Sequence, residues 1–148
     1  MDSNFFALIS RMRYIARWGL LRNALPENIQ ENSHMVAVHA HALGEIRSDI
    51  FGKPCDVNAL ATAALYHDAS EILTGDLPTP IKYHNAEIMS AYHAVEDLAV
   101  QKLLGMLPPE LRETYADVLS EDKDGDIYPL VKAADKLSAY IKCIEERK

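Results

Sequence analysis

The feature that most constrains the fold is a long apolar stretch between Asp56 and Leu73. It is rich in alanine and leucine and apolar nearly all round. A helix of this kind lies at the centre of a domain rather than on its surface. Asp56 can cap its beginning, and Gly75 stands where a C-terminal cap is expected. We therefore expect a central helix from Asp56 to about Leu73.

Apolar residues recur at helical spacing in further segments of the chain. The expected helices begin at Asp2 or Ser3, near Asn32 or Ser33, at Asn85, at Pro108-Pro109 and at Pro129. Breaks are expected at residues 17–19, 51–54 and 105, and the fifth helix should end near Leu119. No segment of four to eight residues alternates convincingly as a strand. The sequence therefore predicts an all-α fold of five to six helices, with residues 1–148 forming one domain.

Composition narrows the class of protein. Of the 148 residues, 49% are hydrophobic and 25% charged, which is ordinary for a globular protein. The formal net charge of -7 argues against binding to a nucleic-acid polymer, whose phosphates would be repelled. Cys55 and Cys143 have neither zinc-site spacing nor a disulfide framework. No apolar segment reaches the roughly 18 residues of a membrane span, so we expect a cytoplasmic protein with no membrane partner.

His67, Asp68 and Glu71 are polar residues grouped within the apolar central stretch. On a regular helix they would share about one turn, because residues three and four apart are neighbours. Adjacent ionisable groups are costly to bury without partners. Imidazole and carboxylates that converge from separate helices form a typical divalent-metal site. The alternative is a histidine hydrogen-bonded to a neighbouring helix with both acids in solvent, but the grouping favours a functional site.

Two further candidates remain open from the residues alone. Arg17-Trp18 could be a core indole beside an arginine that extends to water. Equally, it could be a guanidinium that binds phosphate beside a flat ring for a base or sugar. Asp135 lies next to the apolar stripe of the last helix and could simply be an exposed acid paired with Lys132 or Lys136.

Several segments together resemble one family. They are residues 4–7, 10–13, 17–18, 66–71, 74–80 and 134–135. The chain is similar to the bacterial 5′-deoxynucleotidases of the HD-domain superfamily of metal-dependent phosphohydrolases. The match runs over essentially the whole chain, and residues 66–80 are its most specific part. The resemblance implies a single HD domain built as a helical bundle. Family members usually continue well beyond Lys148, so we expect a chain that lacks terminal helical segments.

The resemblance also implies an activity, the hydrolysis of 2′-deoxynucleoside 5′-monophosphates. It implies one divalent metal ion, Co²⁺, Mn²⁺, Zn²⁺ or Mg²⁺, bound by His67, Asp68, Asp135 and a histidine near the start of the second helix. Glu71 would be the catalytic glutamate, acting together with Asp68. Substrate contacts are implied for Arg17, Trp18, Asp76, Leu77, Pro78 and Thr79. A homodimer is the implied assembly.

One position departs from the family pattern. The early ligand of the family is the histidine of a Glu-His-Ser sequence, and Asn32 takes that place here. His34 is two residues on and would point to roughly the opposite side of a regular helix. An amide oxygen is a weaker ligand than imidazole and favours Mn²⁺ or Mg²⁺. Two alternatives to an active enzyme follow: a catalytically weakened nucleotide-binding HD protein, and a helical interaction module with no small ligand.

Overall fold

The computed structural model of the chain describes residues 4–122 and 125–147. Throughout these residues the regular structure is helical, apart from an isolated antiparallel bridge between Ala16 and Asn28. The predicted all-α class is therefore confirmed. The caps expected at Asp2 and Ser3 lie outside the described residues. In the part of the chain that is described, no helix has the length and apolar character needed to cross a membrane.

The chain divides into two compact units. The first contains the described residues up to Gln30 together with Asp68–Asp117, and the second contains Glu31–His67 with the described residues from Val118 onward. The chain passes from one unit to the other at three points, one of which is the peptide bond that joins His67 to Asp68. The expectation of a single domain over residues 1–148 stays a prediction.

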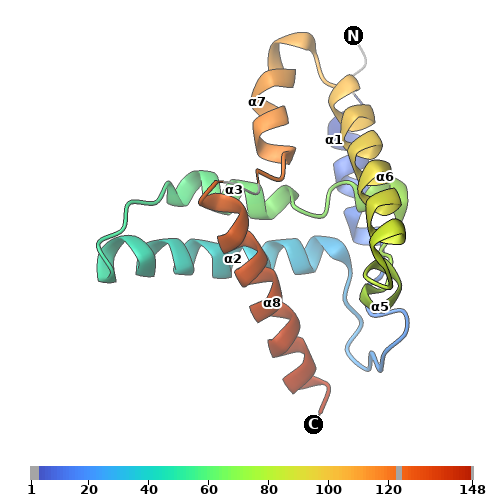
Figure 1. The fold of residues 1–148 in the computed structure, drawn as a ribbon, viewed down its shortest axis with the longest axis horizontal. Coiled ribbons are helices and arrows are strands. Elements are labelled where there is room, and N and C mark those ends of the chain that lie inside the picture. Colours follow the sequence, from blue (N-terminus) through green and yellow to red (C-terminus); the bar gives the residue numbers. More distant parts are fainter. Residues whose placement is uncertain (1–3, 123–124, 148) are drawn as a thin grey trace. The chain divides into compact units, whose positions relative to one another are not determined.

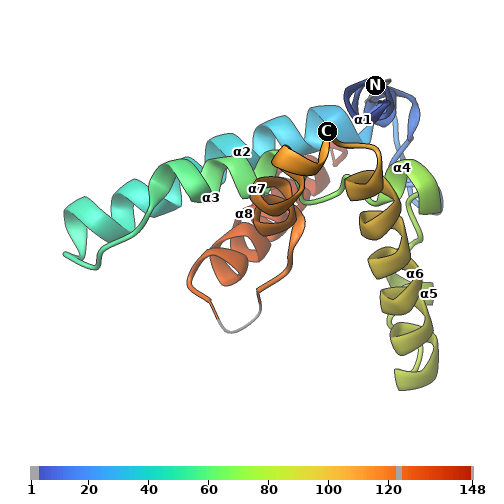
Figure 2. The same cartoon turned by 90° about the horizontal axis from the view of Figure 1, so that it is seen from above.

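Aromatic packing holds the two ends of the first unit together. This unit holds α1 (Phe5–Ile9), the 3-10 helix η1 (Ser10–Tyr14), α4 (Glu71–Thr74), α5 (Thr79–Lys82), α6 (Ala86–Gly105) and most of α7 (Pro109–Leu119). Phe5 is fully buried, and its ring centroid lies 5.1 Å from those of Phe6 and Tyr115, both edge-to-face. Figures 1 and 2 show the short α5 running beside α6.

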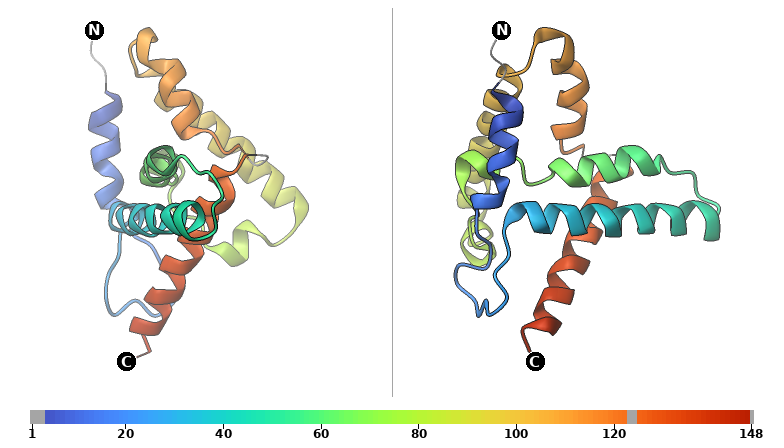
Figure 3. Two further views of the ribbon diagram at one scale, coloured as in Figure 1. Left: turned by 90° about the vertical axis from the view of Figure 1, so that its left-hand side faces the viewer. Right: turned by 180° about the vertical axis from the view of Figure 1, so that it is seen from behind.

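The second unit is built from most of α2 (Ile29–Glu45), the π-helix η2 (Ile46–Ile50), α3 (Val57–Tyr66) and α8 (Ile127–Glu145). Figures 1 and 3 show α2 and α3 side by side, with α8 crossing them. The buried residues of their core are Val36, Ala37, Ala40, Leu60, Ala64, Val131 and Ala134. A Cβ on Gly44 would lie 3.0 Å from a methyl of Leu60, so a larger residue here would require the Leu60 side chain to shift.

The prediction of one continuous helix from Asp56 to about Leu73 is wrong in its second half. Helix α3 ends at Tyr66, a turn follows, and α4 is a separate short helix. The ring Nδ1 of His67 hydrogen-bonds the carbonyl oxygen of Ala64 at 2.7 Å, which is the oxygen that a continuing helix would bond to the amide of Asp68. Glu71 N instead donates to Asp68 O at 3.0 Å, as in a tighter turn. A local side-chain bond therefore replaces a helical one.

Other boundaries differ in smaller ways. Helix α2 begins three residues before Asn32, and α8 begins two residues before Pro129. The proline-rich segment after Gly75 contains the short helix α5, because proline is tolerated in a first helical turn. With α4 and α5 separate, the described residues hold more helices than the five to six expected. Two predicted caps are present: Asp56 accepts from Ala59 N at 2.9 Å at the start of α3, and Gly75 follows α4 at φ 76°.

Candidate active site

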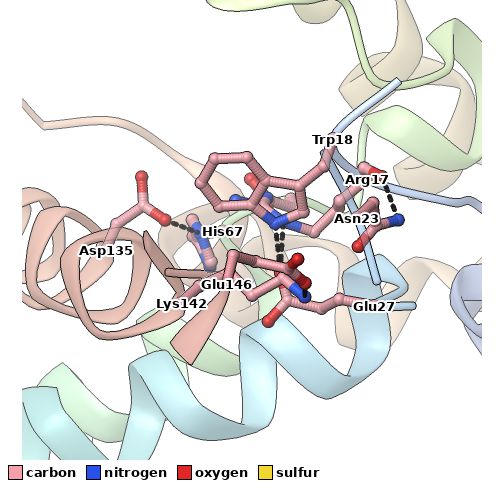
Figure 4. A network of polar contacts seen from close by, with 9 residues as sticks. Arg17, Trp18, Asn23, Glu27, His67, Asp135, Lys142 and Glu146 are labelled. Carbon is pink, nitrogen blue, oxygen red and sulfur yellow. Dashed lines mark hydrogen bonds and ion pairs between the residues drawn. The ribbon is translucent and has the colours of Figure 1, made fainter. Parts of the chain in front are cut away.

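His67 and Asp135 form the polar centre of the second unit. His67 stands at the C-terminal end of α3 and Asp135 lies in α8. The Nε2 atom of His67 lies 3.6 Å from Oδ1 of Asp135, and the histidine side chain is 9% exposed (Figure 4). Because the carbonyl of Ala64 can only accept, Nδ1 carries the hydrogen of this bond. Nε2 then faces the carboxylate of Asp135, where a proton or a metal cation between the two groups would be stabilised.

This donor pair fits a cation. A lone pair and a carboxylate oxygen that face one another repel unless a positive charge is shared between them. A histidine that ligates a metal typically donates its other ring N–H to a backbone carbonyl or carboxylate, as His67 does to Ala64. Within residues 4–122 and 125–147, however, no three or more His, Cys, Asp or Glu side chains are grouped closely enough to hold a metal ion. The full ligand set of His67, Asp68, Asp135 and Asn32 stays a prediction.

The two candidates for the early ligand differ in burial. Asn32 lies in the first turns of α2 with 1% of its surface exposed, and Ser33 beside it is also buried. His34 is exposed. Of the two, Asn32 is therefore the residue directed towards the protein interior, as helical geometry predicts for positions two apart.

Arg17 and Trp18 lie together in the first unit, after η1. The guanidinium carbon of Arg17 lies 5.9 Å from the centroid of the indole ring. Both side chains donate to one atom, Oε2 of Glu27: the indole Nε1 at 2.8 Å and the guanidinium Nε at 3.1 Å (Figure 4). Nη1 of Arg17 reaches Oδ2 of Asp68 at 3.4 Å. A cation, a flat apolar ring and a carboxylate are thus assembled from separate parts of this unit.

Glu71 is buried in α4, with 8% of its surface exposed. Burial is the largest cause that raises its pKa from the ordinary value of 4.5 to about 9. The negative charges of Asp68 and Asp76 act in the same direction. The positive charges of Arg17 and Lys82 oppose them, with smaller effects. Glu71 is therefore a neutral acid at pH 7 in the metal-free protein, and a positive charge brought near it would favour its ionised, proton-accepting form.

The expected substrate loop follows Gly75 directly. Asp76, Leu77 and Pro78 are half-buried, whereas Thr79 is exposed and begins α5. Helix α5 also carries Lys82, whose Nζ donates to Oε1 of Glu96 in α6 at 2.8 Å. The ion pair fixes the far end of the loop.

The charge of Lys82 is maintained by its surroundings. Burial lowers the pKa of Lys82, but the hydrogen bond and negative charge of Glu96 raise it, and the net shift is upward. The ammonium nitrogen also lies 4.4 Å from the ring centroid of Tyr92. Lys82 therefore stays a cation bound to α6.

Sequence reasoning missed three of these residues: Glu27, Lys82 and Glu96. Glu27 lies ten positions from Arg17 in an irregular segment, so no helical periodicity relates the two. Lys82 and Glu96 belong to different helices and carry no motif of their own. No signal in the sequence singled them out among the other charged residues.

Known proteins resemble this chain along nearly its whole length. A family model described as 5′-deoxynucleotidase YfbR-like matches residues 4–148. The 5′-deoxynucleotidase YfbR of Shigella boydii is 50% identical over 146 residues, which are 98% of this chain and 73% of that protein.

Solved structures of HD-domain proteins are also similar to this chain over most of its length. An HD-domain phosphohydrolase from Listeria innocua has a TM-score of 0.86 at 26% identity, over 97% of this chain and 68% of that one. The HD phosphohydrolase DatZ of cyanophage S-2L, solved with dA and one catalytic Zn²⁺, has a TM-score of 0.60 at 27% identity. That match covers 90% of this chain and 66% of the other.

Proposed function

Because the chain belongs to the YfbR-like 5′-deoxynucleotidase family of HD-domain proteins, we propose that it hydrolyses 2′-deoxynucleoside 5′-monophosphates to deoxynucleosides and phosphate. The observation that carries the proposal is the arrangement of Arg17, Trp18, Asp68 and Glu71 in one unit. It combines a guanidinium for a phosphate, a flat ring for a sugar or base, and carboxyl groups that could exchange a proton with water.

Each of these residues has a defined task in the proposal. Arg17 binds the phosphate and neutralises its charge as the ester bond breaks. Trp18 presses against the sugar and leaves little room for a 2′-hydroxyl, while Asp76 accepts a hydrogen bond from the 3′-hydroxyl. Glu71 orients the attacking water and takes its proton on a carboxylate oxygen. The half-buried Leu77 and Pro78, with Thr79 after them, line the substrate.

The proposal includes one divalent metal ion bound by His67, Asp68 and Asp135, with Asn32 as a weak fourth ligand. The contact between His67 and Asp135 and the His67–Ala64 hydrogen bond support the first part of this set. When bound, such an ion polarises a phosphate oxygen and lowers the pKa of a coordinated water. The identity of the metal, the homodimer and the cytoplasmic location belong to the same proposal. The two free cysteines, Cys55 and Cys143, are consistent with a reducing compartment.

A second candidate function rests on Asn32. Its amide occupies a buried position in α2 where the family resemblance implies an imidazole. A neutral amide oxygen donates less charge to a metal than an imidazole nitrogen does. The chain could therefore retain the nucleotide pocket while turning over slowly, as a nucleotide-binding protein with weakened catalysis.

One set of measurements separates the possibilities. Phosphate release from dAMP and from AMP is followed with Mn²⁺, Co²⁺, Zn²⁺ or Mg²⁺ added, alongside binding of dAMP and metal analysis of the purified protein. Release from dAMP in preference to AMP supports the deoxynucleotidase. Binding of dAMP without phosphate release, whichever metal is added, supports the nucleotide-binding protein with weakened catalysis. The absence of both binding and release supports an interaction module.

The variant Glu71→Ala tests the mechanism within this set. It should lose about 10²- to 10⁴-fold in turnover, as expected for a positioned acid–base group, and still bind dAMP. The matched control is Glu113→Ala, which changes an exposed glutamate of α7 in the same unit. Undiminished hydrolysis by Glu71→Ala would exclude Glu71 from the mechanism.

A further inference from the structure

Glu27 binds both Arg17 and Trp18, yet has no task in the chemistry above. A single oxygen, Oε2, accepts from the indole Nε1 at 2.8 Å and from the guanidinium Nε at 3.1 Å (Figure 4). The side chains of Arg17 and Glu27 are 14% and 20% exposed, so both bonds are largely shielded from water. The two groups assigned to the phosphate and the sugar therefore meet at one carboxylate oxygen.

The backbone brings Glu27 to this place. Arg17 N donates to Glu27 O at 2.9 Å, and Ile29 N donates to Ile15 O at 3.0 Å. Together with the bridge between Ala16 and Asn28, these bonds align residues 15–17 antiparallel to residues 27–29. Glu27 thus lies directly across from Arg17. A ladder of this kind leaves a carboxylate at position 27 little freedom to be elsewhere.

Trp18 needs such a contact. Its φ of 66° lies in the left-handed region, which is unfavourable for a bulky residue. A residue in this region persists when its surroundings hold it there. The bond from the indole Nε1 to Glu27 is one such contact, and the guanidinium of Arg17 over the ring is another.

We propose that Glu27 is a positioning residue, which holds the guanidinium of Arg17 and the indole of Trp18 in one mutual arrangement and thereby sets the affinity for a deoxynucleoside monophosphate. The inference rests on the proposed function, since it takes Arg17 and Trp18 as the nucleotide contacts. The guanidinium of Arg17 lies nearer to the carboxylate of Glu27, at 3.1 Å, than to that of Asp68, at 3.4 Å. Misplacing a substrate-binding group by about 1 Å can cost on the order of 10²-fold in rate.

Two variants separate position from charge. Glu27→Gln removes the charge but retains an oxygen at the same distance from the backbone. Because both donors already share one oxygen, the amide oxygen can accept both hydrogen bonds. Glu27→Asp retains the charge but shortens the side chain by one methylene, so that it cannot reach both donors. If Glu27 acts by position, the aspartate variant is the damaged one. A role based on charge predicts the reverse order.

The assay is calorimetric titration of dAMP into each protein in EDTA, which prevents turnover during the measurement. Trp18 is the sole tryptophan of the 148 residues, so the intrinsic fluorescence reports on its indole alone. We expect Glu27→Asp to bind dAMP about tenfold more weakly, with a shifted emission spectrum. We expect Glu27→Gln to stay within about threefold of the wild type, with an unchanged spectrum. Glu113→Asp and Glu113→Gln in α7 are the matched controls, and circular dichroism checks that each variant folds.

A double-mutant cycle tests the link to the indole. Phenylalanine has no N–H, so in the Trp18→Phe background Glu27→Asp should weaken dAMP binding less than it does in the wild type. Equal losses in both backgrounds would indicate a general structural role and overturn the proposal. The proposal would also be overturned if Glu27→Asp bound dAMP with wild-type affinity, or if Glu27→Gln bound dAMP much more weakly than the wild type. A wild type that neither binds nor hydrolyses dAMP would overturn the proposed function and this inference with it.

Discussion

Replacing Glu71 by glutamine is expected to stabilise the metal-free protein, and the gain should grow as the pH rises. The pKa of this carboxyl is about 9 in the folded chain against 4.5 for an ordinary glutamate. The folded state therefore holds a proton that the unfolded state releases between these two values. The stability linked to this proton is fully present below pH 4.5 and is lost as the pH rises towards 9. Glutamine has nearly the same shape and no titration.

The magnitude follows from the same two pKa values. Each pH unit between them changes the free energy of unfolding by about 1.36 kcal/mol. At about pH 7.5 the wild type is roughly three units above 4.5 and still below 9. It has then lost as much as about 4 kcal/mol that Glu71→Gln keeps. With 8% of Glu71 exposed, solvent screens this effect only slightly.

The assay is urea unfolding in EDTA between about pH 5 and pH 9, followed by circular dichroism and by the fluorescence of Trp18. The quantity of interest is the difference in the free energy of unfolding between variant and wild type, because other titrating groups cancel in it. Glu113→Gln, which alters an exposed glutamate, is the control and should show no such trend. A difference that stays constant over this pH range would refute the reasoning, since Glu71 would then be ionised in the folded protein.

Two further predictions concern substrate and metal. Trp18→Ala should bring the kcat/KM for AMP closer to that for dAMP, because the indole no longer excludes a 2′-hydroxyl; an unchanged ratio would remove Trp18 from the selectivity. Asn32→His should retain more metal after dialysis and release phosphate faster from dAMP, with Glu71 still required, because imidazole is a stronger ligand than an amide oxygen. Equal metal content in the two proteins would exclude Asn32 from the ligand set.

The chemistry of this chain was easier to predict from its sequence than the geometry. Ionisable residues in an apolar stretch are rare, so His67, Asp68 and Glu71 stood out without any coordinates. Their arrangement could not be predicted, because one hydrogen bond from His67 to Ala64 ends the helix that the apolar periodicity would continue. Such a bond depends on a side-chain conformation, which a hydrophobic pattern does not encode.

Distant partners that belong to no motif could not be predicted, whereas the family resemblance paired His67 with Asp135, which lie 3.6 Å apart. Glu27 reaches Arg17 through a turn whose course is set by backbone hydrogen bonds, and Lys82 finds Glu96 on another helix. The helix caps are the opposite case. Asp56 and Asn85 accept hydrogen bonds from amides three residues away, so the nearby sequence is enough to predict them. A contact was therefore predictable when it was local or when a family motif marked both of its partners.

The left-handed backbone at Trp18 makes stability and binding compete at one position. Glycine or asparagine would adopt this φ of 66° at lower cost, by about 1 kcal/mol or more. Variants selected for the backbone alone would therefore drift towards a small residue at position 18, whereas those selected on a nucleotide would keep the ring. Engineering this chain for heat resistance should leave that strained residue as it is, because the strain is part of what presents the indole.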